Sequence, residues 1–317
     1  MPRPPHPEVP EPAVEEVTDG VFAYLQLHGQ WGLNNAAFIT ASDSVTLVDT
    51  CFTERRSRAL ADAVRRTAGD RPVRTLINTH HHGDHTHGNY VFGPGVTIVG
   101  HEKCREEVIS TGLTTTAFWP DVDWGEIVIT PPNVTFDERL TLYASDGSVG
   151  GDLELQLIYV GPAHTTNDIL VWLPGRRTLI AGDVVFNGGT PFCVFGSLAG
   201  SLRALDTIRA LAPDRIVPGH GPVCGLEALD GIESYLRFVE ETARRGHEAG
   251  VTPLDLARET GLPDEFAALY DSERFVANLH RAYSELNGDP PGTPLPMPTV
   301  MPDLIAYNGG EMPQCLA

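Results

Sequence analysis

The densest group of potential metal ligands lies between Asn78 and His87, where the chain reads Asn-Thr-His-His-His-Gly-Asp-His-Thr-His. Neutral imidazole and carboxylate together are the ligands of zinc and related divalent ions. A purification tag would lie at a terminus and would lack the interleaved Asp84. The apolar run 73–77 before this segment is typical of a buried strand, and Gly83 permits a tight turn. The sequence therefore predicts a metal-binding loop at a strand end, where α/β proteins place ligands.

Three more loops each carry one ligand-type residue directly after an apolar run: His164, Asp183 and His220. Each residue alone has an ordinary explanation, because loop histidines are often structural and an Asp after Gly is a common turn residue. Together with the first loop, they favour a shared metal site. The spacing in the first loop offers two separable ligand pairs, His80 with His82 and Asp84 with His85.

The elements that would position these loops follow from apolar periodicity. Strands are predicted at 21–27, 36–40, 45–49, 75–77, 96–99, 153–160, 169–173, 178–181 and 216–217. Helices are predicted at 54–68, 202–211, 226–247 and, as the last one, 264–286. Residues 103–150 are less regular and hold an aromatic, proline-braced insertion that is either core cover or a substrate lid. The six prolines of 288–302 predict a non-helical strap.

Composition limits the classes of partner. The 317 residues carry a formal net charge of −20, which argues against nucleic acid and anionic membrane surfaces. Five dispersed cysteines do not form a disulfide framework and favour a reducing compartment. The proline-rich, acidic start lacks the features of a secretory signal, and no run reaches membrane-spanning length. We expect a cytoplasmic enzyme with an irregular arm at 1–15.

The four loops resemble the sequence motifs of the metallo-β-lactamase superfamily over about residues 20–225. The resemblance implies an α/β fold, an αββα sandwich with a dinuclear metal site at one edge. We expect the catalytic domain at 16–225 and a helical C-terminal extension at 226–317, packed on the same domain. The implied ligands of one metal are His80, His82 and His164, and those of the other are Asp84, His85 and His220, with Asp183 bridging.

The same resemblance assigns roles around the metals. Asp84 would orient the attacking hydroxide and take its proton. Asp49 would lie near the site and support the ligands without binding a metal itself. His81, His87 and His101 fall outside the ligand pattern. Five imidazoles with two carboxylates suit zinc, so two Zn²⁺ ions are the expected cofactors. The bridging Asp183 is typical of the hydrolase branch, such as glyoxalase II and the lactonases, and His82 stands where flavodiiron oxidoreductases carry Glu.

Longer stretches are similar to the metallo-β-lactamase-like cyclases of aromatic, actinorhodin-type polyketide pathways. These stretches are 30–35, 79–89, 118–125, 161–168, 190–192 and 306–310. The likeness implies second-ring cyclisation, thioester release of a chain bound to an acyl carrier protein, or both. Substrate contacts are then expected from Trp119, Trp124, Phe192 and Phe195. A homodimer is possible for such a chain.

Two other functions are compatible with the same residues. A general thioester or lactone hydrolase would need only the core motifs. A non-catalytic metal-binding protein is disfavoured, because a protein without catalysis is free to lose at least one ligand. Metal content and thioesterase turnover discriminate between the enzyme and the binding protein.

Overall fold

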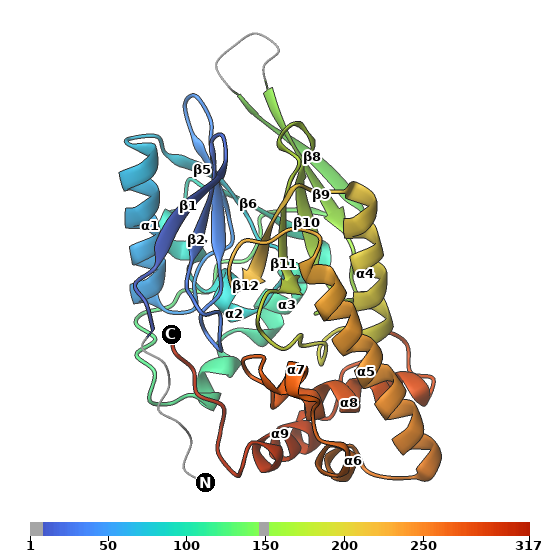
Figure 1. Cartoon of the computed structure of the whole chain (residues 1–317). Coiled ribbons are helices and arrows are strands. Elements are labelled where there is room, and N and C mark those ends of the chain that lie inside the picture. Colours follow the sequence, from blue (N-terminus) through green and yellow to red (C-terminus); the bar gives the residue numbers. More distant parts are fainter. Residues whose placement is uncertain (1–8, 146–151) are drawn as a thin grey trace.

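Two β-sheets face each other in the computed structural model, which describes residues 9–145 and 152–317 (Figure 1). One sheet has the order β1-β2-β3-β4-β5-β6-β7 and the other has the order β12-β11-β10-β9-β8. The first contains β1 (Ala13–Thr18), β2 (Val21–Leu25), β3 (Ala36–Thr40), β4 (Val45–Val48), β5 (Val73–Ile77), β6 (Thr97–His101) and β7 (Val134–Phe136). The second contains β8 (Arg139–Ser145), β9 (Asp152–Tyr159), β10 (Ile169–Leu173), β11 (Thr178–Phe186) and β12 (Arg215–His220).

Strand periodicity divides the side chains between two cores. In β2, Val21, Ala23 and Leu25 point between the sheets, where they pack with residues of β9, β10 and β12. The alternate residues Phe22 and Tyr24 join the cluster on the outer face of the same sheet. Because both faces of these sheets are covered, their central strands are apolar almost throughout, which explains why they could be recognised from the sequence.

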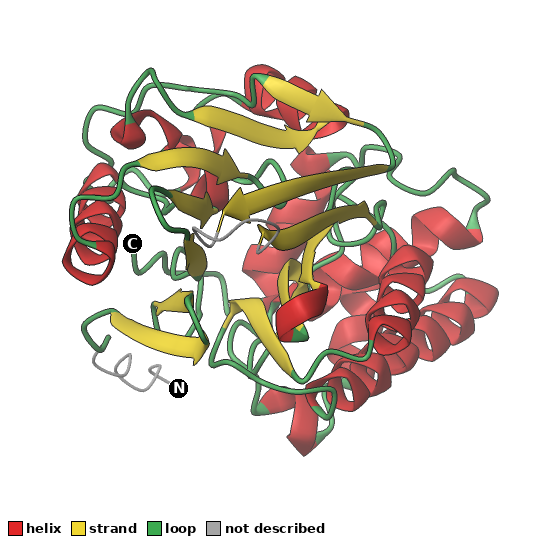
Figure 2. Cartoon of the chain, turned by 90° about the horizontal axis from the view of Figure 1, so that it is seen from above, coloured by secondary structure: helices red, strands yellow, loops and turns green. Residues whose placement is uncertain are grey.

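Helices cover the two outer faces of the sandwich. α1 (Glu54–Ala68) packs Leu60 and Val64 on the first sheet, while α4 (Leu198–Leu211) and α5 (Ala228–Ala249) cover the second. The Thr53 side chain caps α1 by accepting a hydrogen bond from the Arg56 amide. The view from above shows the two sheets between helical layers (Figure 2). The predicted αββα sandwich is therefore confirmed, and a helical region follows it.

Four predictions about individual segments need correction. Residues 13–15 of the expected irregular arm belong to β1, which pairs with β2; residues 1–8 lie outside the described ranges. The less regular segment 103–150 contains most of α3 (Glu102–Thr111) together with β7 and β8, although 146–151 also lie outside those ranges. β8 alternates half-buried and exposed residues along an edge, so it gives a weak apolar signal.

The predicted last helix at 264–286 is two helices, α7 (Asp264–Ala267) and α8 (Arg274–Leu286). Between them the backbone of Tyr270 bonds to Gly188 and Thr190 of a distant loop, an interaction that local sequence does not reveal. The strap prediction for 288–302 is wrong from Met297 on, where α9 (Met297–Tyr307) begins. Its first prolines fall in the first turn, where backbone N–H groups have no helical partner, so they are tolerated there.

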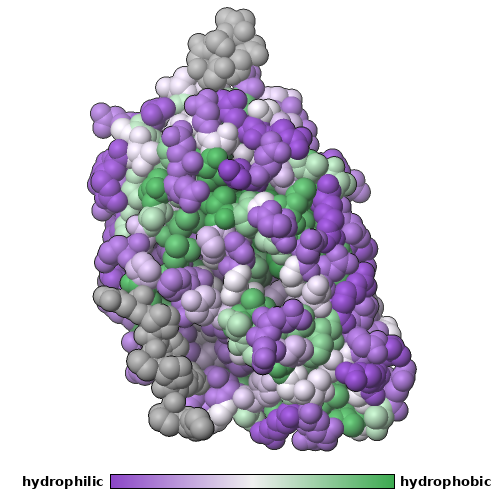
Figure 3. Space-filling model, viewed as in Figure 1, coloured by the Kyte–Doolittle hydropathy of each residue, from purple (hydrophilic) through white to green (hydrophobic). Residues whose placement is uncertain are grey.

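The C-terminal helices α6 (Pro253–Thr260), α8 and α9 lie below the sandwich in the view of Figure 1, next to the strand ends that carry the ligand loops. On the face drawn in Figure 3, hydrophobic residues gather in the middle over the sheets and hydrophilic residues surround them. Within the described ranges, no helix is long and apolar enough to cross a membrane. The domain limits and a homodimer stay predictions.

Candidate metal centre

Four strands, β5, β9, β11 and β12, bring the predicted ligands to one place, and Asp183 lies inside its strand, not after it as predicted. His80, His82, Asp84 and His85 follow β5, the last two within the short helix α2 (Gly83–Thr86). His164 follows β9, Asp183 lies inside β11, and His220 ends β12. Gly182 gives β11 a residue with φ +50°, and a Cβ there would meet Thr79 Oγ1 at 2.6 Å. Glycine is therefore required beside Asp183, because the first ligand loop approaches the strand so closely.

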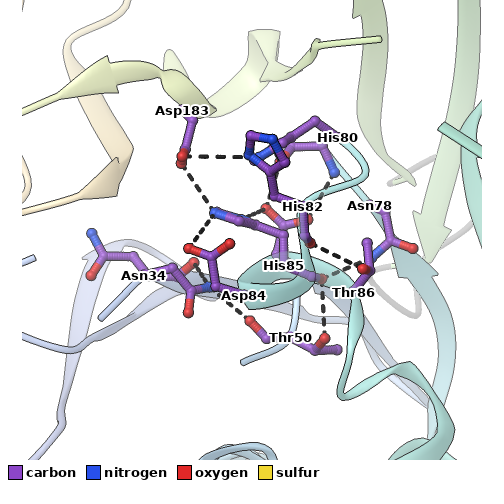
Figure 4. A network of polar contacts seen from close by, with 12 residues as sticks. Asn34, Thr50, Asn78, His80, His82, Asp84, His85, Thr86 and Asp183 are labelled. Atoms are coloured by element: carbon purple, nitrogen blue, oxygen red, sulfur yellow. Dashed lines mark hydrogen bonds and ion pairs between the residues drawn. The ribbon is translucent and has the colours of Figure 1, made fainter. Parts of the chain in front are cut away.

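The ligand atoms form two groups, in each of which they lie within 4.8 Å of one another. One group holds His80, His82, His164 and Asp183, and the other holds Asp84, His85 and His220. Asp183 connects them: its Oδ1 lies 3.1 Å from His85 Nε2, and its Oδ2 lies 3.3 Å from Nε2 of both His164 and His220. Figure 4 shows Asp183 facing His80 and His85 across the centre. The structure thus brings together all seven predicted ligands.

Partners behind the rings fix the orientation of three imidazoles. His85 Nδ1 lies 2.8 Å from Asp49 Oδ2, His220 Nδ1 lies 3.0 Å from the Gly29 carbonyl, and His164 Nδ1 bonds to the Phe192 carbonyl. A carbonyl oxygen has no proton to give, so the Nδ1–H of His164 and of His220 must donate. In the neutral ring, Nε2 then presents its lone pair to the centre, as a metal ligand must.

Two hydrogen bonds from Thr79 hold the Asp49 carboxylate, which orients the ring of His85. It accepts hydrogen bonds from the Thr79 amide at 2.8 Å and from the Thr79 hydroxyl at 2.6 Å. Its backbone has φ 62°, in the left-handed region, which Gly, Asn and Asp adopt more readily than other residues. Asp49 therefore acts on the site through His85 and contributes no atom to either ligand group.

The centre contains two carboxylates, Asp84 and Asp183, and neutral histidines carry no charge to balance them. Burial lowers the pKa of His80 and of His82 well below the usual range, with neighbouring histidines adding to the effect. Burial also lowers the pKa of His220, but Asp183 and Asp84 outweigh it and raise the value to about 9. Burial raises the pKa of Asp183, but His220 and His85 outweigh this effect and hold the value well below its usual range. A cation is thus electrostatically favoured here.

The donor set fits divalent ions. His80 Nε2, His85 Nε2 and Asp183 Oδ1 are buried and have no hydrogen-bond partner of acceptable geometry. Orphaned buried polar atoms are costly, so several at one point indicate a missing partner of another kind. His82 Nδ1 and His164 Nε2 lie 2.8 Å apart, so these two rings direct a nitrogen to the same point and would both hold an ion of this group. Nitrogen and carboxylate donors at such short separations are typical of sites for divalent ions.

A cavity opens directly onto the two groups. It has about 810 Å³ of empty space, part of which is open solvent. His82, Asp84, His164, Asp183 and His220 form its polar end. The other walls are mostly aromatic rings and methionines: Trp31, Phe52, Phe118, Trp119, Phe186, Phe192, Phe195, Met297, Met301 and Met312.

The predicted substrate residues are partly placed at this cavity. Trp119, Phe192 and Phe195 line it, whereas Trp124 does not. Trp124 packs edge-on against Phe52 at 4.7 Å and donates its indole N–H to the Trp119 carbonyl, so its role is to support the wall. Sequence reasoning missed Arg274 and the three methionines, because nothing local indicates that segments after residue 270 return to the strand ends.

The three histidines left out of the ligand pattern have other partners. His81 Nδ1 lies 2.9 Å from the Asn167 side-chain amide, and His87 stacks on Phe52 with ring centroids 5.4 Å apart. His101 caps α3 by accepting from the Lys103 amide, and its Nε2 lies 2.8 Å from the Asp137 carbonyl. None of the three belongs to either ligand group.

This fold and site define a known class of proteins. Residues 29–220 match the sequence model of the metallo-beta-lactamase superfamily, a range that includes every predicted metal ligand. The chain therefore belongs to the metallo-beta-lactamase superfamily, whose members are metal-dependent hydrolases.

Among its relatives is the linear primary-alkylsulfatase of Pseudomonas sp. (strain ATCC 19151), 25% identical over 86% of this chain and 60% of that protein. The 2,4-dinitroanisole O-demethylase subunit alpha of Nocardioides sp. (strain JS1661) is 31% identical over 64% of this chain and 54% of that protein. The chain thus spans little more than half the length of these two relatives. The crystal structure of the sec-alkylsulfatase Pisa1 from Pseudomonas sp. has a similar fold, with TM-score 0.67 and 17% identity over 95% of this chain and 55% of that one.

A first prediction tests whether the position of Asp183 controls metal binding. A Cβ added at Gly219 would lie 1.9 Å from Asp183 Oδ1 and 2.6 Å from the Gly182 carbonyl carbon. Gly219→Ala should therefore displace the carboxylate and lower the metal content per chain, measured by elemental analysis, although every ligand is still present.

Gly175→Ala is the matched control, because a Cβ there meets nothing within 4 Å. It should keep the metal content of the unchanged protein. Full metal content in Gly219→Ala would mean that metal binding does not depend on the position of the Asp183 carboxylate.

A second prediction concerns proton release. With a pKa raised to about 9, His220 carries a proton at pH 7 in the metal-free protein, whereas a metal ligand must be neutral. Metal binding at pH 7 should therefore release protons, and the apparent affinity should rise with pH up to about 9. Calorimetric titrations in buffers of different ionisation enthalpy measure the released protons, and a release of zero at pH 7 would contradict this protonation state.

Proposed function

We propose that this chain is a dinuclear zinc enzyme that acts on a carbonyl group of an aromatic polyketide. In this proposal it closes the second ring, releases the chain from an acyl carrier protein as a thioesterase, or does both. The observation that carries the proposal is the opening of the seven-ligand cluster into a cavity whose walls are aromatic rings and methionines. A flat, apolar substrate with few oxygens suits such walls, because aromatic rings bind one another in offset or edge-on arrangements.

Divalent ions, when bound, supply Lewis acidity to a carbonyl oxygen and a water molecule with a pKa near neutrality. Asp84 would take the proton of that water. Its carboxylate lines the cavity, and its Oδ2 lies 3.4 Å from His220 Nε2. Burial raises the pKa of Asp84, but His85 and His220 outweigh it and lower the value, so the carboxylate is ionised and able to accept a proton at neutral pH.

The cavity walls would orient the substrate and exclude water. Trp31 meets Phe192 edge-on with centroids 5.3 Å apart, and Trp119 lies tilted at 5.8 Å from Trp31. These rings stand beside His164, whose ring lies 6.3 Å from that of Phe192. A substrate held against them would therefore have its reacting carbonyl within reach of the metal ligands. A dry wall also strengthens the electrostatic interactions at that carbonyl.

The second candidate is a general hydrolase of thioesters or lactones. The ligand cluster alone supports it equally well, because hydrolysis needs no aromatic wall. The two curated relatives carry names that refer to an alkyl sulfate ester and to 2,4-dinitroanisole, an aromatic ether. An assay panel of an aromatic acyl thioester, a short acyl thioester, a lactone and an alkyl sulfate discriminates between these functions. Turnover of the alkyl sulfate alone would contradict both.

The role of Asp84 yields a third prediction. Asp84→Asn retains an oxygen donor but cannot take a proton, so turnover of a thioester should fall by about 10²–10⁴-fold. Thermal unfolding should stay close to that of the unchanged protein, and at least one metal ion per chain should remain bound. Near-normal turnover in a variant that is full of metal would remove Asp84 from the proton transfer.

The substrate class yields a fourth prediction. Trp119→Ala removes one ring from the cavity wall and should lower kcat/KM for an aromatic acyl thioester by about two- to tenfold. A short acyl thioester has no ring to stack, so its kcat/KM should change little. Trp124→Ala is the matched control, since this tryptophan supports the wall without lining it, and it should not discriminate between the two substrates. Equal losses on both substrates in Trp119→Ala would identify Trp119 as packing only.

A further inference from the structure

Arg274 is a buried cation in the wall of the cavity. It is the first residue of α8, outside the residues 29–220 that match the superfamily. Its side chain is 2% exposed, and yet it lines the cavity. Its guanidinium carbon lies 4.1 Å from the ring centroid of Trp31, 5.1 Å from that of Phe186 and 5.6 Å from that of Phe192. The guanidinium is thus surrounded by the rings that form the apolar wall.

The hydrogen bonds of Arg274 leave donors unused. One terminal nitrogen donates to the Thr190 carbonyl at 3.0 Å, and the other lies 2.9 Å from Asp271 Oδ2. Nε is buried and has no partner. A guanidinium has five N–H donors in a fixed fork, so a buried arginine with an orphaned N–H beside a cavity can donate to an oxygen of a bound ligand.

The charge of Arg274 is also incompletely balanced. Burial raises the pKa of Asp271 to about 7 although Arg274 opposes the shift, so near neutrality this carboxylate is ionised in only part of the molecules. Among the described residues that line the cavity, Arg274 is the one arginine or lysine. Glu273, the preceding residue, accepts the Trp31 indole N–H at 2.7 Å and keeps that ring against the guanidinium.

We propose that Arg274 forms an anion subsite in the cavity, which binds a carboxylate on a flat aromatic substrate whose rings lie against Trp31 and Phe192. The subsite deepens the proposed function and rests on it, because it states that the aromatic substrate is an anion and where its charge lies. The metal ligands and the guanidinium line the same cavity, so one molecule could present its carbonyl to the metals and its carboxylate to Arg274.

Binding of a matched pair of probes tests the subsite without turnover. 2-Naphthoate and 2-naphthamide have the same ring system and differ in charge, and calorimetry measures the affinity of the metal-loaded full chain for each. Arg274→Gln should weaken naphthoate binding by about tenfold or more, the size of a lost charge-assisted hydrogen bond, and leave naphthamide binding almost unchanged. An unchanged ratio, or equal losses for both probes, would overturn the subsite, and equal losses would leave Arg274 as a support for Trp31.

Arg281 provides the control variant. It is fully buried on the same helix and donates to the carbonyls of Val194 and Thr293, but it does not line the cavity. Arg281→Gln should therefore disturb packing without changing the ratio of the two affinities. Because metal is present in every variant, any contact of naphthoate with the metals contributes equally to all of them.

A second variant shifts the affinity in the opposite direction and keeps the test decisive if Arg274→Gln does not fold. Asp271→Asn removes the internal counter-charge of Arg274, so naphthoate should bind more tightly while naphthamide does not change. A weaker or unchanged naphthoate affinity would contradict the subsite. If the probes behave as expected but no thioester is turned over, the proposed function fails and the anion subsite stands.

Discussion

The buried carboxylate of Asp183 is the constraint on which both halves of the sandwich depend. Its oxygens lie 3.1 Å from His85, which follows strand β5 of the first sheet, and 3.3 Å from His220, the last residue of strand β12 in the second sheet. A carboxylate removed from water is costly unless opposite charge compensates it. Because the compensation comes from both sheets, the sheets must keep a fixed separation and register at this edge. Divalent ions held by the two ligand groups would compensate the same carboxylate without requiring protonated histidines.

Two adjacent asparagines hold the ligand loops in that register through polar contacts. Asn34 donates to the Thr50 carbonyl at 2.7 Å, next to Asp49, and so connects to the residue that orients His85. Asn35 donates to the carbonyls of Pro218 and Gly221 at 3.0 and 2.7 Å, on either side of the His220 loop. Both asparagines are buried, where satisfied polar networks are rigid and specific. The ligand loops are therefore positioned by hydrogen bonds within the chain itself.

The metal ligands could be predicted from the sequence because each lies beside a strong local signal. His80 to His85 follow an apolar run, Asp183 lies inside β11, which is buried throughout, and His220 ends β12, in which only Arg215 is exposed. The limits of β3 and α1 were also predicted from periodicity, since these elements pack on one core. Such features depend on neighbours within a few residues, which is the range over which sequence patterns are informative.

The cavity wall could not be predicted in the same way, because it depends on contacts between distant segments. α7 and α8 separate where Tyr270 bonds to Gly188 and Thr190, and no Gly or Pro marks the break at 268–271. α9 was concealed by its prolines, although only Pro302 lies beyond the first turn of the helix. Trp124 carries the same local signal as Trp119, and only tertiary packing shows which of the two faces the cavity.

The superfamily region supplies the metal ligands, and the C-terminal segments supply part of the cavity wall. All seven ligands lie within the matched residues 29–220, whereas Arg274 and all three methionines after Met1 come from beyond them and line the cavity. Methionine side chains are flexible and polarisable, so this wall can adapt to the outline of an apolar ligand. The C-terminal tail is pinned where the Trp119 indole donates to the Pro313 carbonyl at 2.6 Å and the Leu316 amide donates to the Trp31 carbonyl at 2.9 Å. These two hydrogen bonds connect the C-terminal tail to two tryptophans of the cavity wall. A change in the C-terminal segments would therefore alter the shape and charge of the cavity, while all seven metal ligands lie before residue 221.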